Sequence, residues 1–360
     1  MRTARAALLT GPNTTRIENI PLPEIGVDDA LLRVEACGLC GSDIEQITTG
    51  GRMPLPVIPG HEPLGIIEQI GPRAAERWGV TTGDRVVVEV VVPCRECRHC
   101  RDGLFTYCDR SIGAYGYRPF DAPSTLIGGW SEYMYLHPNS VVHKMDATIP
   151  VAIAATYNSL AAGIRWAVQL GGVKQGDTVV VLGAGQRGIA AVIAARAAGA
   201  DRIFITGLAR DSHKLAIAQA FGAEAAILAD EEDVPGRVRE LTDESLADVV
   251  LDITPMAAQP VRDALEIVRG GGTIVLAGLK HGHAIELVTD TLIQKGVTMV
   301  GARGVEGSSI EAAIRLIESG EYPLELLTTH TFSLDDAVSA VAVLAGDVPG
   351  ETAINVAIVP

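Results

Sequence analysis

In the second half of the chain, short apolar runs alternate with longer stretches that have helical spacing or are rich in alanine. Runs of about five apolar residues suit buried strands, whereas a period of 3.6 residues predicts helices. The expected strands are 178–182, 202–206, 248–252, 273–277 and 297–301. The expected helices are 187–199, 211–221 and 258–268. This alternation predicts an α/β fold with a doubly wound parallel sheet.

The rest of the chain has a different pattern. Before residue 90, strand-like runs are broken by glycine and proline, which is typical of a small β-rich domain. The strands expected there are 30–36, 65–71 and 85–90. A helix is expected at 154–168, and the end of the chain predicts helices at 308–319 and 334–345 and a strand at 353–359.

A glycine-rich turn follows the apolar run 178–182 and has the pattern G-x-G-x-x-G. Gly183 permits a tight turn, Gly185 lets the backbone approach a pyrophosphate, and Gly188 lets the helix pack closely on the strand. The N-terminus of the following helix offers free N–H groups to phosphate. The pattern alone also occurs in ordinary turns, but the strand before it and the helix after it favour a dinucleotide site.

A charge-rich loop over 94–108 contains four cysteines. They are Cys94, Cys97, Cys100 and Cys108. Four thiols at this spacing can close one tetrahedral site, so we expect a structural zinc. A nucleic-acid-binding zinc ribbon is the alternative, and the acidic charge of the chain argues against it.

Two further candidate metal ligands lie in separate short motifs. Cys40 ends the segment Cys37-Gly38-Leu39-Cys40, and His61 lies in Gly60-His61-Glu62. A thiolate and an imidazole brought together from two loops suit zinc. The two residues alone are equally compatible with a buried structural cysteine and a capping histidine.

The composition limits the classes of partner. The chain has 360 residues, a formal net charge of −15, a pI near 5.0 and a mean hydropathy of +0.25. An acidic chain is a poor match for nucleic acid or an anionic membrane. No apolar run reaches the roughly 20 residues of a membrane span. Because the apolar part of segment 1–12 is short for a signal peptide, we expect a cytoplasmic protein whose cysteines bind metal.

Aromatic residues are concentrated between 105 and 135. One interpretation is that they pack a long loop rich in glycine and proline. The other is that Tyr115, Tyr117 and Phe120 form the wall of a substrate pocket.

These motifs, in this order, resemble the zinc-containing medium-chain alcohol dehydrogenases over essentially the whole chain. The resemblance also includes Gly129-Trp130-Ser131-Glu132-Tyr133. It implies a GroES-like catalytic domain over 1–158, with the zinc lobe at 94–108, a Rossmann coenzyme domain over 159–300, and a return to the catalytic domain over 301–360. It also implies an active site between the domains and a homodimer or homotetramer.

For the chemistry, the resemblance implies zinc-assisted hydride transfer between an alcohol and a nicotinamide. By the family pattern Cys40 and His61 are zinc ligands, and Glu62 supports the metal or replaces a water in its shell. Ser42 takes the position of the hydroxyl that accepts the alcohol proton. Asp43 orients a ligand imidazole.

Two positions of the catalytic domain depart from the family pattern. Asn158 stands where a third protein ligand is expected, and an amide oxygen is a weaker zinc ligand than a thiolate or carboxylate. Glu45 stands where many members have a proton-relaying histidine. Glu45 can relay the proton, accept a substrate hydroxyl as in polyol-oxidising relatives, or be solvated.

The coenzyme site also departs from the pattern. The second strand ends at Gly207, where a carboxylate for the ribose of NAD is expected, and Arg210 and Lys214 follow. Two cations without that carboxylate favour NADP over NAD. Asp211 is the one candidate to restore NAD binding, although it is also placed as a helix cap.

Within the glycine turn, Gln186 and Arg187 are counted with the coenzyme site. Arg187 either contacts the pyrophosphate or points outward.

The sequence thus predicts a zinc-dependent NAD(P) oxidoreductase that acts on an alcohol, secondary or polyhydroxylated, and its carbonyl product. One alternative is a zinc-independent medium-chain reductase of activated double bonds or quinones. A more distant alternative is a non-catalytic nucleotide-binding protein.

Overall fold

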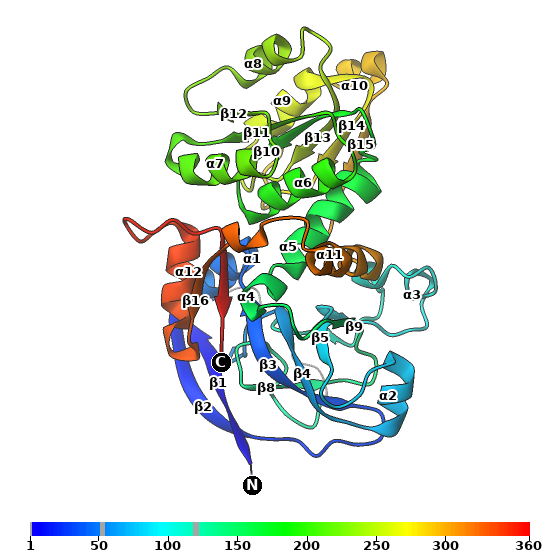
Figure 1. Cartoon of the computed structure of the whole chain (residues 1–360), viewed down its shortest axis with the longest axis vertical. Helices are drawn as coiled ribbons and strands as arrows, with labels where there is room; N and C mark the ends of the chain where they lie inside the picture. The colour runs from blue at the N-terminus through cyan, green and yellow to red at the C-terminus, as the bar shows by residue number, and fades with distance from the viewer. Residues whose placement is uncertain (1, 51–54, 118–121) are drawn as a thin grey trace. The chain divides into compact units, whose positions relative to one another are not determined.

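The computed structural model describes residues 2–50, 55–117 and 122–360 (Figure 1). The chain divides into two compact units, one made of Met1–Asn158 with Glu306–Pro360 and the other of Ser159–Val305. The second unit is thus inserted into the first. Within the described ranges, no helix is long and apolar enough to cross a membrane.

The inserted unit has a fully parallel sheet with the order β12-β11-β10-β13-β14-β15. Its strands are β10 (Thr178–Leu182), β11 (Arg202–Gly207), β12 (Ala225–Leu228), β13 (Ala247–Asp252), β14 (Val268–Leu276) and β15 (Thr298–Gly301). The chain starts in the middle and winds outward in both directions, so the order reverses between β10 and β13. This Rossmann arrangement confirms the predicted fold class, and ligands of such sheets bind where the order reverses.

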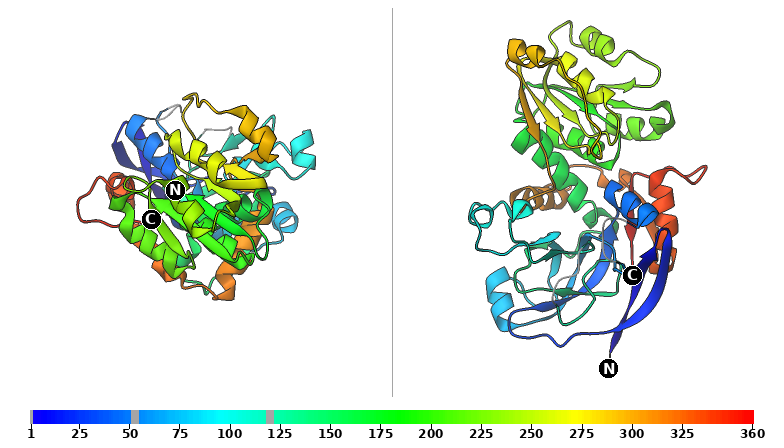
Figure 2. Two further views of the ribbon diagram at one scale, coloured as in Figure 1. Left: turned by 90° about the horizontal axis from the view of Figure 1, so that it is seen from above. Right: turned by 180° about the vertical axis from the view of Figure 1, so that it is seen from behind.

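Helices cover both faces of this sheet (Figures 1 and 2). They are α6 (Gln186–Ala197), α7 (Ser212–Ala220), α8 (Val234–Leu241), α9 (Gln259–Ile267) and α10 (Thr289–Lys295). Helices α6 and α7 pack on β10 and β11, and α9 and α10 pack on β13 and β14. The apolar side chains of Val179–Leu182 are buried on both sides, as expected for a central parallel strand.

The alanine content of α6 has a packing reason. A Cβ at Gly163, the last residue of α5 (Tyr157–Gly163), would lie 2.4 Å from the backbone of Ala190 in α6. The backbones of α5 and α6 therefore lie almost in contact at this point. Only small side chains leave room for that approach, and α6 is buried over most of its circumference.

The first unit has a mostly antiparallel sheet with the order β16-β17-β3-β4-β5-β9, and β8 also pairs with β3. Its strands are β3 (Ala30–Gly38), β4 (Glu62–Ile70), β5 (Arg85–Val88), β8 (Tyr133–Leu136), β9 (Val142–Met145), β16 (Thr328–Phe332) and β17 (Asn355–Ile358). Two smaller pairs are β1 (Thr3–Gly11) with β2 (Thr14–Pro21) and β6 (Val91–Val92) with β7 (Gly113–Ala114). Because β17 pairs with β3, the last strand of the chain completes the first unit.

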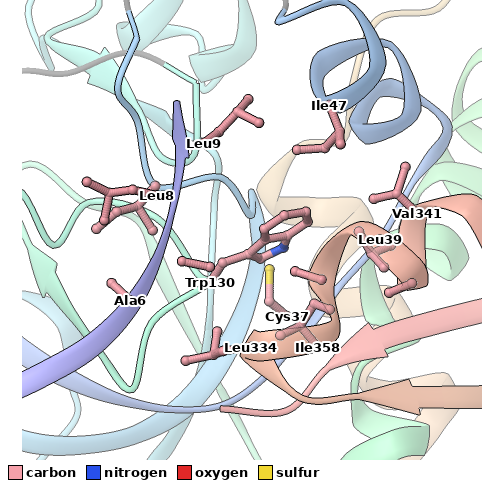
Figure 3. Close-up of a cluster of buried hydrophobic side chains, with 14 of the residues drawn as sticks. Ala6, Leu8, Leu9, Cys37, Leu39, Ile47, Trp130, Leu334, Val341 and Ile358 are labelled. Carbon is pink, nitrogen blue, oxygen red and sulfur yellow. The ribbon is translucent and has the colours of Figure 1, made fainter. Parts of the chain in front are cut away.

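Helices surround this sheet, and the main core lies beneath them. The helices are α1 (Gly41–Thr49), α2 (Pro72–Trp78), α3 (Arg98–Arg101), α4 (Val151–Ala154), α11 (Gly307–Ser319) and α12 (Ala337–Ala345). Trp130 is fully buried at the centre of a cluster to which α1, α12 and both ends of the chain contribute (Figure 3). The sulfur of Cys37 points toward its ring, so Cys37 is a core residue.

Some expected elements differ from the structure. Instead of one helix over 154–168, α4 ends at Ala154, α5 (Tyr157–Gly163) follows, and Ile164–Leu170 is π-helical. The strand expected over 85–90 ends at Val88. Strand β12 and helices α8 and α10 were not expected. Strand β12 begins with two alanines, which have low strand propensity, so its pattern was weak.

Candidate functional site

Three potential metal ligands meet at one end of the antiparallel sheet. Cys40 is the N-cap of α1, directly after β3, and His61 and Glu62 stand at the start of β4. Strands β3 and β4 are paired so that Gly38 lies opposite Glu62, which brings the two motifs together. The candidate ligand atoms all lie within 4.8 Å of one another, and the three residues are buried.

Cys40, His61 and Glu62 are called the donor set here, because each offers one possible metal-ligating atom, and the distances between these atoms fit zinc. Cys40 Sγ lies 3.1 Å from His61 Nε2, and Glu62 Oε1 lies 3.8 Å from the same nitrogen. A thiolate, an imidazole and a carboxylate are ordinary zinc ligands, and a buried set of them without a metal would leave polar atoms in the core.

Asp43 fixes the orientation of two of these donors. Its Oδ2 accepts the backbone N–H of Cys40 at 2.8 Å, and its Oδ1 lies 3.2 Å from His61 Nδ1. With a metal bound, a proton on Nδ1 facing this carboxylate would leave Nε2, which lies near Cys40, free to act as a ligand. Burial lowers the pKa of His61, but the charges of Asp43, Tyr117 and Cys40 outweigh it, and the net pKa is raised.

The loop before His61 has a conformation that only glycine supports comfortably. Gly60 has φ +94°, and a Cβ there would lie 2.5 Å from Cδ1 of Trp130 and 2.9 Å from Sγ of Cys37. The chain therefore passes tightly over the buried tryptophan just before it presents the imidazole.

Two hydroxyl groups lie beside the donor set. Ser42 Oγ is 2.8 Å from Cys40 Sγ and 2.7 Å from the hydroxyl oxygen of Tyr117. That tyrosine oxygen is also 3.3 Å from His61 Nε2. Burial raises the pKa of Tyr117, so its phenol stays protonated and can donate a hydrogen bond.

The three aromatic residues considered as a pocket wall have different environments. Tyr115 is fully buried in the core, and its hydroxyl is 2.7 Å from Ser140 Oγ, which fits the packing interpretation for this residue. Tyr117 reaches the donor set, whereas Phe120 lies outside the described residues.

The two departures from the family pattern lie in different surroundings. Glu45 is exposed on α1. The side chain 2.7 Å from the Ser42 hydroxyl is that of Tyr117. Asn158 is buried and follows Tyr157, whose hydroxyl donates to the carbonyl oxygens of Pro63 and Val88. The backbone before Asn158 is thereby held beside the strand that begins with Glu62.

The four cysteines of the lobe converge as predicted by their spacing, and all are free thiols. The sulfur atoms of Cys97 and Cys100 are 3.5 Å apart, and those of Cys94–Cys100 and Cys97–Cys108 are 3.9 Å apart. A tetrahedron with Zn–S bonds of about 2.3 Å has edges of about 3.8 Å, so the four sulfurs fit one zinc. Backbone N–H groups lower the pKa of Cys94 to about 6.

In the inserted unit, the fingerprint glycines lie between β10 and α6. A Cβ at Gly188 would be 1.9 Å from the carbonyl oxygen of Gly183, whereas one at Gly185 would meet no atom within 4 Å. Gly188 thus closes the helix onto the strand, and Gly185 leaves open space in front of the helix N-terminus. This cradle fits the pyrophosphate of a dinucleotide.

The side chains of the glycine turn are partly turned inward. Gln186 is buried at the first position of α6. The guanidinium of Arg187 lies 5.5 Å from the ring centre of Trp166, in the π-helical segment. Arg187 therefore does not simply point outward; its contact with a pyrophosphate stays a prediction.

At the end of β11, the predicted coenzyme residues are only partly available. Lys214 Nζ is 2.7 Å from Oδ1 of Asp211, so this cation already has a counter-charge. Asp211 is the N-cap of α7, but its side chain makes no capping bond. Arg210 is exposed and forms no ion pair with any residue that the structure describes.

Comparisons with known proteins agree with this geometry. The family model "Alcohol dehydrogenase GroES-like domain" matches residues 26–147, and "Zinc-binding dehydrogenase" matches 188–319. A probable alcohol dehydrogenase of Mycobacterium tuberculosis is 41% identical over 99% of this chain and 98% of its own. The chain belongs to the zinc-containing alcohol dehydrogenase family. It is an oxidoreductase of the NAD(P)-dependent alcohol dehydrogenase type.

Two further relatives extend the comparison. An erythritol/L-threitol dehydrogenase of Mycolicibacterium smegmatis is 30% identical over 99% of this chain and 97% of its own. The solved structure of the alcohol dehydrogenase TADH from Thermus sp. ATN1 superposes with a TM-score of 0.86, with 26% identity and 99% of both chains covered.

Two contacts beside the donor set were not foreseen in the sequence, although Ser42 and Tyr117 were both named there. The bond between Ser42 and Tyr117 joins residues 75 positions apart. Gln46 is buried on α1 and donates to the carbonyl of Gly116, which positions the loop that carries Tyr117. Gln46 could have been found from its position three residues after Asp43, because residues at this spacing lie on the same face of a helix.

Proposed function

We propose that this alcohol dehydrogenase interconverts a secondary or polyhydroxylated alcohol with its carbonyl product, using zinc held by Cys40, His61 and Glu62. The observation that carries the proposal is the buried donor set with two hydroxyls at its edge. A bound zinc would supply a Lewis acid for the substrate oxygen, and a bound nicotinamide would supply the hydride acceptor.

The residues of the chain have separable tasks in this reaction. Ser42 accepts the proton of the alcohol while its own proton passes on to Glu45 or to solvent, and Tyr117 steadies the Ser42 hydroxyl through their 2.7 Å contact. Asp43 keeps the imidazole of His61 in the orientation in which Nε2 faces the metal position. Asn158 is proposed to lie near the metal, and Glu45 to contact a substrate hydroxyl or relay its proton.

The polyol preference has independent support. Polar side chains stand at positions 45 and 158, and a relative with 30% identity over nearly the whole chain is named for two tetritols. Each additional substrate hydroxyl needs a hydrogen-bond partner, which these side chains can provide.

The deciding measurement is the zinc content per chain, followed by turnover of secondary alcohols and polyols with NADP and NAD. We expect two zincs, one in the lobe formed by Cys94, Cys97, Cys100 and Cys108. Cys40→Ala should lose one zinc and abolish turnover, whereas Cys37→Ala, a matched core cysteine, should keep both metals. A single lobe zinc together with reduction of activated double bonds would instead identify a zinc-independent reductase.

For the coenzyme, the proposal is binding along Gly183, Gly185, Gln186, Arg187 and Gly188, with NADP preferred to NAD. Support comes from the lack of a carboxylate at Gly207 and from Arg210, which is exposed and has no ion-pair partner among the described residues. Lys214 supports the preference less strongly than its sequence position suggests, because Asp211 already neutralises it.

We also propose a cytoplasmic homo-oligomer, a dimer or tetramer. Leu279, Val288 and Ile293 are 74%, 69% and 77% exposed, and all belong to the segment between β14 and β15. Strand β15 ends the sheet, and no strand of the described chain covers its outer edge. Exposed apolar side chains and an open strand edge in the same unit both favour contact with a second copy. Six free cysteines suit a reducing compartment.

A further inference from the structure

The end of β11 is where a Rossmann sheet normally provides a carboxylate for the adenosine ribose. In this chain that position has no room for one. A Cβ at Gly207 would lie 3.0 Å from Cδ2 of Leu215 and 3.1 Å from Cβ of Ala184. Both contacts are tighter than ordinary packing, so a larger side chain there would have to displace the leucine. A carboxylate for this site must come from another element.

The neighbouring strand brings one to the same place. Beyond the end of β12, the N–H of Ala229 donates to the carbonyl of Gly207 at 2.8 Å. The next residue, Asp230, accepts the N–H of Ala209 through Oδ1 at 2.9 Å. Asp230 is therefore attached to the turn that follows β11, although 23 residues separate it from Gly207 in the sequence.

The second oxygen of this carboxylate is available. Within the described part of the chain, Oδ2 of Asp230 has no hydrogen-bond partner, and the residue is exposed. Asp211, the N-cap of α7, and Lys214, within that helix, neutralise each other at 2.7 Å. Neither Arg210 nor Asp230 forms an ion pair with a described residue, and the two have opposite charges.

We propose that Asp230 is a specificity-determining residue for the coenzyme. Its Oδ2 accepts a hydrogen bond from a ribose hydroxyl of NAD, and its charge opposes the 2′-phosphate of NADP, which Arg210 attracts. The inference rests on the proposed NAD(P) function and refines it. The balance between these two side chains sets how strongly the enzyme prefers NADP.

The substitution Asp230→Asn tests the charge with little change in shape, because the amide oxygen can still accept the N–H of Ala209. Dissociation constants for NADPH and NADH are measured by nicotinamide fluorescence on the purified, zinc-containing protein. Removing one unit charge next to a phosphate should tighten NADPH about three- to tenfold. NADH should weaken by a similar factor, because the ribose hydroxyl loses a charged acceptor.

The matched control is Glu231→Gln, which removes the same charge from the next residue of the same exposed turn. It should change the NADPH-to-NADH ratio by less than half as much on a logarithmic scale. Arg210→Ala should shift the ratio in the opposite direction from Asp230→Asn.

Three outcomes would count against the inference. Equal weakening of both coenzymes by Asp230→Asn would show that the residue only closes the turn at Ala209. An equal shift in the Glu231→Gln control would show a general effect of charge. If the unmodified protein binds neither coenzyme while retaining its metal, the proposed function itself fails, and Asp230 has no ligand to select.

Discussion

At the residue scale, the donor set depends on side chains that serve two partners each. Asp43 holds both the backbone of Cys40 and the imidazole of His61, so one carboxylate couples two ligand motifs. Ser42 likewise contacts Cys40 on one side and Tyr117 on the other. Substitutions here should therefore change reactivity more than global stability.

Tyr117→Phe removes the hydroxyl that contacts Ser42 and leaves the ring in place. We expect kcat to fall about three- to tenfold, the equivalent of one hydrogen bond, with two zincs retained. Tyr115→Phe is the control, because its hydroxyl bonds to Ser140 in the core and should affect unfolding rather than kcat. Unchanged kcat in Tyr117→Phe, measured with steady-state kinetics and metal analysis, would remove the tyrosine from the proposed site.

The convergence of Cys40, His61 and Glu62 could be expected from the sequence through the family resemblance, and the structure brings the three together. Their zinc chemistry stays a prediction. Tyr117 was expected only as a possible pocket wall, and neither its contact with Ser42 nor the place of Asp230 beside the turn after β11 could be predicted, for a physical reason. Each reaches its site through the conformation of a loop or through the pairing of two strands, and neither leaves a local pattern of spacing. Gly207 illustrates the same limit, because the crowding by Leu215 that excludes a side chain there appears only in the folded chain.

At the scale of elements, strong periodicity gave reliable predictions and weak periodicity did not. The central strands β10 and β13 each contain a run of at least three apolar residues and lie where they were expected. By contrast, α10 has no buried residue. Its sequence therefore lacks the apolar face that would predict a packed helix. The π-helical segment Ile164–Leu170 could not be predicted either, because the spacing of its apolar residues is the same as in an ordinary α-helix.

The fingerprint turn between β10 and α6 permits a paired test. Gly188→Ala places a Cβ 1.9 Å from the carbonyl of Gly183, so it should destabilise the fold by about 1–3 kcal/mol. Gly185→Ala meets open space and should cost under about 1 kcal/mol of stability. Its added methyl should nevertheless weaken coenzyme binding about tenfold.

Denaturant unfolding and coenzyme fluorescence, measured on both variants, separate the two effects. Normal coenzyme affinity in a stable Gly185→Ala variant would mean that the pyrophosphate does not lie against this turn.

The proposed zinc would hold the lobe more than apolar packing does, since its helix α3 has only four residues, of which Cys100 alone is buried. Cys97→Ser should lose one zinc per chain and lower the midpoint of thermal unfolding, since metal binding stabilises such loops directly. Arg98→Ala, which changes an exposed residue of the same helix, is the control and should keep both metals. A metal content of two in Cys97→Ser would contradict the proposed four-cysteine site.

At the scale of the whole molecule, a unit with a parallel sheet is inserted into a β-rich unit. The last strand of the chain, β17, completes the β-rich unit by pairing with β3. The faces of the parallel sheet are covered by helices, whereas no strand of the described chain pairs with the outer edge of β15. Leu279 and Ile293, in the segment between β14 and β15, are among the most exposed large apolar residues described. This asymmetry locates the proposed self-association on the inserted unit.

Replacing both Leu279 and Ile293 with glutamate should dissociate the oligomer, because two copies would bring four charges into one apolar contact. Val27→Glu is the control; that valine is 49% exposed but belongs to the other unit, and its substitution should leave the oligomer intact. Sedimentation velocity measures both. A variant that remains oligomeric, with unchanged circular dichroism, would place the interface elsewhere. Dissociation together with retained coenzyme binding would show that the Rossmann sheet keeps its fold without a partner at this edge.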